Sequence, residues 1–131
     1  MIVLDTHALV WWVNGSPALP ARVKRAVQAA RSDGPLHASA ISAFEIATAV
    51  RRWRLELGSP VERWLGDLAL LPELHFQPVT AEIARIAGTF EDEAPGDPAD
   101  RLIAATALAL GAKLVTADAK LRRFAKVTTV W

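Results

Sequence analysis

Short runs of apolar residues alternate along the chain with longer segments in which apolar residues recur at helical spacing. The short runs predict strands at residues 1–4, 36–39, 74–79, 113–116 and 127–131. The longer segments predict helices at residues 6–13, 16–31, 40–53, 60–71, 81–90, 98–110 and 119–124. Strands that alternate with helices in this way are typical of an α/β fold with a largely parallel sheet. No repeat, linker or low-complexity tract interrupts the pattern, which favours one domain over residues 1–131.

Several of the predicted helices begin with residues that favour a helix start. The segment Ser59-Pro60-Val61-Glu62 is consistent with a capping box that has proline at the first helical position. Asp97 precedes Pro98 and is expected to accept backbone N–H groups as an N-cap. Asp5 and Asp118 each stand before a predicted helix, and each could be an N-cap for the same reason.

Composition restricts the cellular compartment and the kinds of binding site that the protein can have. The chain has no cysteine, which excludes disulfides and thiolate metal sites. Its apolar start lacks a basic n-region and contains Asp5, and no apolar run is long enough for a membrane span. We therefore expect a cytoplasmic protein without a membrane partner. The formal net charge is +1, so contact with an acidic partner would depend on local basic patches.

Four acidic residues from distant parts of the sequence are expected at one edge of the sheet. Asp5 ends the first predicted strand, and Asp118 follows the strand at 113–116. Glu45 lies early in the helix after the second strand, and Asp100 lies in the first turn of its helix. Ligands of open parallel sheets bind where strands end and the following helices begin, so this edge is the expected site.

These four acids predict a divalent-cation site. Glu45 is the only charged residue in the run AISAFEIATAV, and a carboxylate in such surroundings needs a partner. Two like charges ~4 Å apart repel by about 4 kcal/mol at an effective dielectric constant of roughly 20, so clustered carboxylates protonate or bind cations. No lysine adjoins any of the four, although Arg101 could offset one of the acids. An oxygen ligand set without cysteine or a HExxH pair suits Mg²⁺ or Mn²⁺.

Four sequence motifs carry a family resemblance. They are DTHALVWW at the start, SAFEIA around Glu45, GDPADRLIAATA around Asp100 and LVTAD ending at Asp118. In this order they resemble the PIN-domain ribonucleases, and in particular the VapC-type toxins of bacterial toxin–antitoxin modules. The resemblance implies a single PIN domain, a three-layer α/β/α sandwich with a mainly parallel central sheet. It also implies a metal-dependent endoribonuclease that hydrolyses RNA phosphodiester bonds with Mg²⁺ or Mn²⁺.

Matched position by position, the resemblance also implies roles for individual residues. The metal-binding and catalytic residues would be Asp5, Glu45, Asp100 and Asp118, supported by Thr6, Asp97 and Thr116. The implied partners are an RNA substrate, such as tRNA or another structured RNA, and a small antitoxin. A homodimer or a toxin–antitoxin hetero-oligomer is the implied assembly. Many relatives have an aromatic residue where Ala99 stands, which affects the fit of the substrate rather than the chemistry.

Two other functions are compatible with an acidic α/β domain of this size. A PIN-like domain kept only as a binding module would be expected to have lost one or more of the four acids, which are all present. A Mg²⁺-dependent phosphoacceptor receiver domain normally has two adjacent acids after the first strand and a lysine at the end of a late strand. Here Asp5 stands alone and Thr116 occupies the late strand end, so the receiver hypothesis ranks lower.

The remaining aromatic and basic residues allow more than one interpretation. Tryptophans 11, 12, 53 and 64 are more typical of the core than of base stacking, although the family resemblance adds partner interfaces as a third possibility. Two basic clusters either stabilise helix ends or bind RNA: Arg51, Arg52 and Arg54, and Lys120, Arg122, Arg123 and Lys126. The three histidines, at 7, 37 and 75, have no spaced partner, which predicts structural or peripheral roles.

Overall fold

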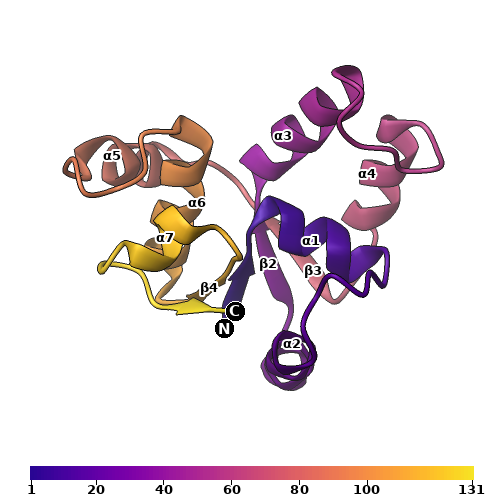
Figure 1. Ribbon diagram of the computed structural model, residues 1–131, viewed down its shortest axis with the longest axis horizontal. Coiled ribbons are helices and arrows are strands. Elements are labelled where there is room, and N and C mark those ends of the chain that lie inside the picture. Colours follow the sequence, from indigo (N-terminus) through magenta and orange to yellow (C-terminus); the bar gives the residue numbers. More distant parts are fainter.

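A five-stranded parallel sheet forms the centre of the computed structural model, which describes residues 1–131 (Figure 1). The strand order is β3-β2-β1-β4-β5, and all four neighbouring pairs run parallel. The strands are β1 (Ile2–Leu4), β2 (Leu36–Ser39), β3 (Leu74–Gln77), β4 (Lys113–Val115) and β5 (Thr129–Val130). The predicted α/β class with a mainly parallel sheet is confirmed.

Seven helices cover the two faces of the sheet and complete a three-layer sandwich. They are α1 (Thr6–Val13), α2 (Ala21–Asp33), α3 (Ala40–Arg51), α4 (Val61–Ala69), α5 (Ala81–Thr89), α6 (Pro98–Leu110) and α7 (Ala119–Arg123). One buried core packs α1, α2 and α4 on one face, and a second packs α5, α6 and α7 on the other. Figure 1 shows these groups on the right and left of the sheet. Helix α3 contacts both α4 and α6, so it bridges the two halves.

One predicted helix start and one predicted capping box are wrong. The second helix begins at Ala21 instead of Ser16, because a proline disfavours helical geometry at the residue before it, and Pro20 follows Leu19. The preceding residues form a turn in which the Ser16 hydroxyl accepts the Ala18 N–H at 3.1 Å. The expected capping box at 59–62 is also absent, since Pro60 is the N-cap of α4 and no side chain bonds to that cap.

The order of the strands places a crevice at the carboxyl end of β1. Strand β1 lies between β2 and β4, so successive connections leave it in opposite directions. Ligands of open α/β sheets bind at such a switch point, outside the carboxyl ends of the strands. The Asp5 N–H donates to the Val115 carbonyl at 3.0 Å and so fixes the end of β1 against β4. None of the helices combines the length and apolar character needed to cross a membrane.

The tryptophans differ sharply in burial. Trp64 on α4 is 9% exposed and belongs to the core, and Trp11 and Trp12 on α1 pack against that core, as predicted. Trp53, just after α3, is 90% exposed, which excludes the core among the places that the sequence left open for it. Its backbone φ is 59°, a left-handed conformation that costs roughly 1–2 kcal/mol for a residue with a Cβ.

Candidate active site

A cavity of about 340 Å³ opens at the carboxyl edge of the sheet. Four carboxylates predicted from the sequence line it: Asp5, Glu45, Asp100 and Asp118. Asp5 follows β1, Glu45 lies on α3, Asp100 is in the first turn of α6, and Asp118 caps α7. Parallel strands that end at one edge bring these distant segments together.

Asp5 is the most rigidly held of the four acids. Its side chain is almost fully buried, with 4% of the residue exposed. Oδ1 accepts the Thr6 N–H at 2.8 Å, which makes Asp5 the N-cap of α1. Oδ2 accepts the Thr116 hydroxyl at 2.6 Å, and His7 Nδ1 lies 3.5 Å from the same oxygen. Two hydrogen-bond donors from two segments, and the nearby His7 ring, therefore fix the orientation of this carboxylate.

Glu45 is half-buried and connected to α1. The Thr6 hydroxyl donates to Glu45 Oε1 at 2.6 Å, and Thr6 Oγ1 also lies 2.8 Å from the hydroxyl of the fully buried Ser42. Burial raises the pKa of Glu45, the Thr6 hydrogen bond opposes that rise, and the negative charges of Asp5 and Asp97 add to it. The carboxylate is therefore positioned for a ligand but is poorly neutralised by the protein.

Asp100 is the acid whose protonation is most strongly perturbed. Burial is the largest cause of a rise in the pKa of Asp100 to about 7, and the negative charges of Asp97, Asp5, Asp118 and Glu45, in that order, supply the rest. Asp97 is the N-cap of α6 and accepts the Asp100 N–H at 3.1 Å. Carboxylate oxygens of Glu45, Asp97 and Asp100 all lie within 4.8 Å of one another. Asp97 thus lies within the cluster itself, whereas the family resemblance implies only a supporting role for it.

Asp118 is anchored by the start of α7 and by Thr116. Its Oδ1 accepts the N–H groups of Lys120 at 2.8 Å and Leu121 at 3.0 Å. Its own N–H donates at 3.0 Å to the hydroxyl of Thr116, which in turn donates to Asp5. Thr116 is fully buried, so this single hydroxyl connects two of the four acids away from water.

The cluster lacks a neutralising base. No lysine or arginine nitrogen lies within 4.0 Å of a carboxylate oxygen anywhere in the chain. The one basic side chain that approaches a carboxylate this closely is His7, which faces Asp5. The expectation that Arg101 offsets an acid is wrong. Its guanidinium donates to the carbonyls of Ala87 at 2.9 Å, Pro95 at 3.1 Å and Phe90, so it ties the loop before α6 to that helix.

His7 was predicted to be structural or peripheral, but it lines the acidic cavity. Its Nε2 accepts the Ala117 N–H at 2.9 Å, which assigns the ring proton of the neutral form to Nδ1, the atom facing Asp5. The ring packs against Trp11 and Trp131 at centroid distances of 5.1 and 5.9 Å. His37 and His75 face each other on β2 and β3 at 5.6 Å and do not line this cavity.

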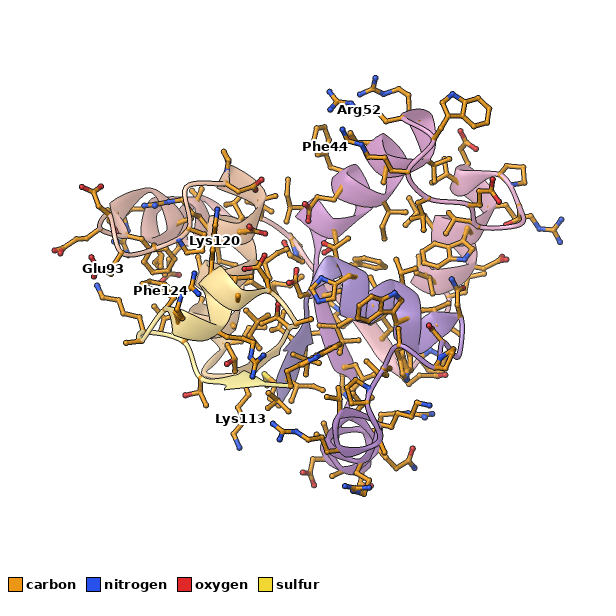
Figure 2. The ribbon with its side chains drawn as sticks, viewed as in Figure 1. Phe44, Arg52, Glu93, Lys113, Lys120 and Phe124 are labelled. Atoms are coloured by element: carbon orange, nitrogen blue, oxygen red, sulfur yellow. The ribbon has the colours of Figure 1, made fainter.

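A second cavity of about 470 Å³ lies next to the first, between α3 and the start of α6. Glu45 and Arg54 line both cavities, while Phe44, Arg52 and Asp97 line only the second. Figure 2 shows Phe44 and Arg52 close together on α3, and Lys120 on α7 in the other half of the molecule. The acidic site is therefore bordered on one side by arginines and an exposed aromatic ring.

Comparisons with known proteins agree with this architecture. The family model for the PIN domain matches residues 2–127. The chain is 39% identical to "Ribonuclease VapC22" of Mycobacterium tuberculosis (strain ATCC 25618 / H37Rv), over 99% of this chain and 98% of that protein. Its fold is similar to that of VapBC2 from Rickettsia felis bound to a promoter DNA fragment, with a TM-score of 0.73, 20% identity and 99% and 98% of the two chains covered. It is also similar to FitAcB from Neisseria gonorrhoeae, with a TM-score of 0.69, 24% identity and 100% and 97% covered.

Proposed function

The chain belongs to the PIN-domain family, and we propose that it is a metal-dependent endoribonuclease, the toxin of a toxin–antitoxin pair. One observation carries the chemical part of this proposal. Four carboxylates from four segments surround one cavity, and no lysine or arginine lies within 4.0 Å of any of them. The 39% identity to a protein named a ribonuclease supports RNA as the substrate.

The residues around the cavity fit a hard divalent cation. The available ligand atoms are carboxylate oxygens, because the chain has no cysteine and His7 Nε2 is already occupied by the Ala117 N–H. Oxygen-only sites suit Mg²⁺ or Mn²⁺. We propose that Asp5, Glu45, Asp100 and Asp118 hold the cation, with Asp97 close enough to contribute. When bound, the cation would supply activation of a water molecule and neutralisation of the charge that develops on the phosphate.

The protein contributes the fixed orientation of these acids. Thr116 and His7 hold the Asp5 carboxylate, and Thr6 holds that of Glu45. Groups held by such outer contacts lose less conformational freedom when they bind a ligand or reactant. Thr6 and Thr116 therefore act as positioning residues in this proposal, through the hydroxyl hydrogen bonds that they donate to the two carboxylates.

The raised pKa values of Glu45 and Asp100 fit a site that binds a cation. In the cation-free protein these carboxyl groups retain protons at higher pH than ordinary carboxyl groups do, because burial and neighbouring charges disfavour ionisation. A bound cation favours the ionised form, so binding should release protons and should strengthen as the pH rises toward 8.

We further propose a small antitoxin as the protein partner and the cytoplasm as the compartment. One structure with the same fold, with a TM-score of 0.65, is described as a toxin–antitoxin complex from Klebsiella pneumoniae. The receiver-domain hypothesis is set aside, because the PIN family model covers residues 2–127. A silent binding module is the remaining alternative, but the full set of acids gives it no support.

Cleavage of RNA by the purified protein tests the proposal. Total cellular RNA and a tRNA pool are incubated with the wild type in Mg²⁺ or Mn²⁺ and in EDTA. Asp100→Asn is compared with Asp67→Asn, a control in which an exposed acid on α4 is changed in the same way. We expect cleavage that requires the cation, is lost in Asp100→Asn and persists in Asp67→Asn. Equal cleavage by both variants would contradict the proposal.

A further inference from the structure

Trp53 is a residue that neither packing nor backbone preference explains. At 90% exposure it is the most exposed of the large hydrophobic side chains, so its ring contributes almost nothing to stability through burial. Its φ of 59° lies in the left-handed region, where glycine is favoured. The turn itself is held by backbone bonds, since the Arg54 N–H donates to the Ala49 carbonyl at 2.9 Å. A glycine would make the same turn with less strain, so the indole has a use at the surface.

The charges around Trp53 indicate what it binds. Arg52 and Arg54 flank it, and neither has a carboxylate within 4.0 Å. A favourable interaction with the helix dipole accounts for a cation at Arg52, the C-cap of α3, but the effect fades beyond the last turn. Arg54 lies beyond that turn and lines the acidic cavity. Two arginines without a carboxylate partner therefore adjoin an exposed aromatic residue in the sequence, and these are the groups that bind the phosphates and bases of single-stranded nucleic acid.

We propose that Arg52, Trp53 and Arg54 form a stacking platform for an unpaired base of the RNA substrate. The indole stacks on the base while the two arginines contact neighbouring phosphates, the combination by which proteins hold single-stranded nucleic acid. Only an unpaired base exposes a free face, since a base within a duplex is stacked on both sides. This inference rests on the proposed ribonuclease function, and it adds a contact with an unpaired base just beyond the end of α3.

The position of the platform predicts its kinetic effect. Glu45 lies six residues before the end of α3 at Arg51, roughly 9 Å along the helix axis at 1.5 Å per residue, and Trp53 follows two residues after that end. The base that stacks on Trp53 therefore belongs to a nucleotide outside the acidic cavity, whose lining does not include Trp53. Loss of the ring should raise KM for RNA and leave kcat nearly unchanged, because the contact holds the substrate without touching the reacting atoms.

Trp53→Gly tests the platform, since its effects on stability and on RNA binding should have opposite signs. Glycine suits a φ of 59°, so the melting temperature should rise or stay constant. Affinity for an unstructured oligoribonucleotide, measured in the Asp100→Asn background to prevent cleavage, should fall roughly five- to hundredfold. Trp53→Phe should retain most of the affinity. Leu70→Ala, which removes another side chain that is 81% exposed, is the control and should leave affinity unchanged.

The outcomes separate this inference from the proposed function. If the wild type cleaves RNA and Trp53→Gly binds and cleaves it equally well, the platform is wrong and the ribonuclease proposal stands. If Trp53→Gly loses self-association or protein binding and keeps its RNA affinity, Trp53 serves a protein interface and the platform is again wrong. If the wild type neither binds nor cleaves RNA, both proposals fail.

Discussion

The hydroxyl of Thr116 donates a hydrogen bond to Asp5 Oδ2 at 2.6 Å, joining residues 111 positions apart in the sequence. The same hydroxyl accepts the Asp118 N–H at 3.0 Å. Both atoms of the O–H group are therefore used, and Thr116 is fully buried. Two of the proposed cation ligands thus depend on one side chain that would not itself touch the cation.

Replacing the Thr116 hydroxyl should lower both the stability of the fold and the affinity of the site for a cation. Thr116→Val keeps the volume but leaves the buried Asp5 carboxylate and the Asp118 N–H short of a partner, which should lower the free energy of unfolding by about 1–3 kcal/mol. Loss of an outer hydrogen bond of this type should weaken Mn²⁺ binding by roughly 10–100-fold. Denaturant unfolding and calorimetric titration with Mn²⁺ measure the two effects.

Thr106→Val is the matched control, because Thr106 is also fully buried and its hydroxyl donates to the Leu102 carbonyl at 2.8 Å within α6. This substitution should change stability modestly and leave the affinity for Mn²⁺ unaltered. Similar losses of affinity in the two variants would show that the Thr116 hydroxyl has no special relation to the site.

The raised pKa of Asp100 predicts a stability difference that depends on pH. The pKa is 3.8 ordinarily and about 7 in the folded protein, so the folded state binds more protons than the unfolded state between these values. The contribution of Asp100 to the stability of the cation-free protein is therefore greatest below pH 4 and is lost as the pH rises through 7. In EDTA, the melting temperature of Asp100→Asn should exceed that of the wild type by a margin that grows from pH 5 to pH 8.

The difference in melting temperature between Asp100→Asn and the wild type should reverse its sign when the cation is present. At pH 8, Mg²⁺ or Mn²⁺ should raise the melting temperature of the wild type, because ligands that bind only the folded state stabilise it. Asp100→Asn should lose most of this gain, whereas Asp67→Asn should keep it. A difference in melting temperature between the wild type and Asp100→Asn that stays constant over pH 5–8 in EDTA would contradict the raised pKa of Asp100.

His7 should matter to the site as well as to the fold. His7→Phe keeps an aromatic ring beside Trp11 but removes the acceptor for the Ala117 N–H and the Nδ1 atom that faces Asp5. We expect the free energy of unfolding to fall by about 1–3 kcal/mol. Binding of Mn²⁺ should weaken by roughly tenfold or more, as for other outer-contact losses. His75→Phe, at an exposed position on β3, should change neither quantity by a comparable amount.

Arg101 should act on the loop before α6 and should not act as a counter-charge. Arg101→Ala leaves the carbonyls of Ala87, Phe90 and Pro95 without their donor and should destabilise the protein by about 2–4 kcal/mol. Arg101→Lys should recover only part of the loss, because an ammonium group cannot reproduce the planar fork of donors. Arg85→Ala, an exposed arginine on α5, should be nearly neutral in the same unfolding measurement. Full recovery by lysine would favour a role based on charge alone.

Local signals in the sequence were sufficient for the order of the elements and for much of the acidic edge. Apolar periodicity predicted all five strands, and aspartate before a helical segment predicted the N-caps at Asp5, Asp97 and Asp118. Each cap is a contact within three residues, so it can be inferred from neighbours in the chain. The common edge of the acids followed from the polarity of parallel strands, which requires no side-chain geometry.

The contacts that hold the acids in place could not be inferred in the same way. The hydrogen bonds from Thr6 to Glu45, from Thr116 to Asp5 and from Ala117 to His7 join residues 39, 111 and 110 positions apart. Such contacts depend on how helices and strands pack, and spacing along the chain does not encode them. The expectation for Arg101 failed for a related reason, since its side chain donates to carbonyls at the end of α5 and in the loop after it instead of to the neighbouring acid.

The most direct test of the central claim, that these carboxylates hold a divalent cation, is anomalous diffraction from crystals soaked in Mn²⁺ at pH 8. We predict an anomalous peak in the cavity lined by Asp5, Glu45, Asp100 and Asp118, with carboxylate oxygens as its protein ligands. The peak should vanish in Asp100→Asn crystals treated identically. An empty cavity in the wild type, or a peak held by other residues, would contradict the claim.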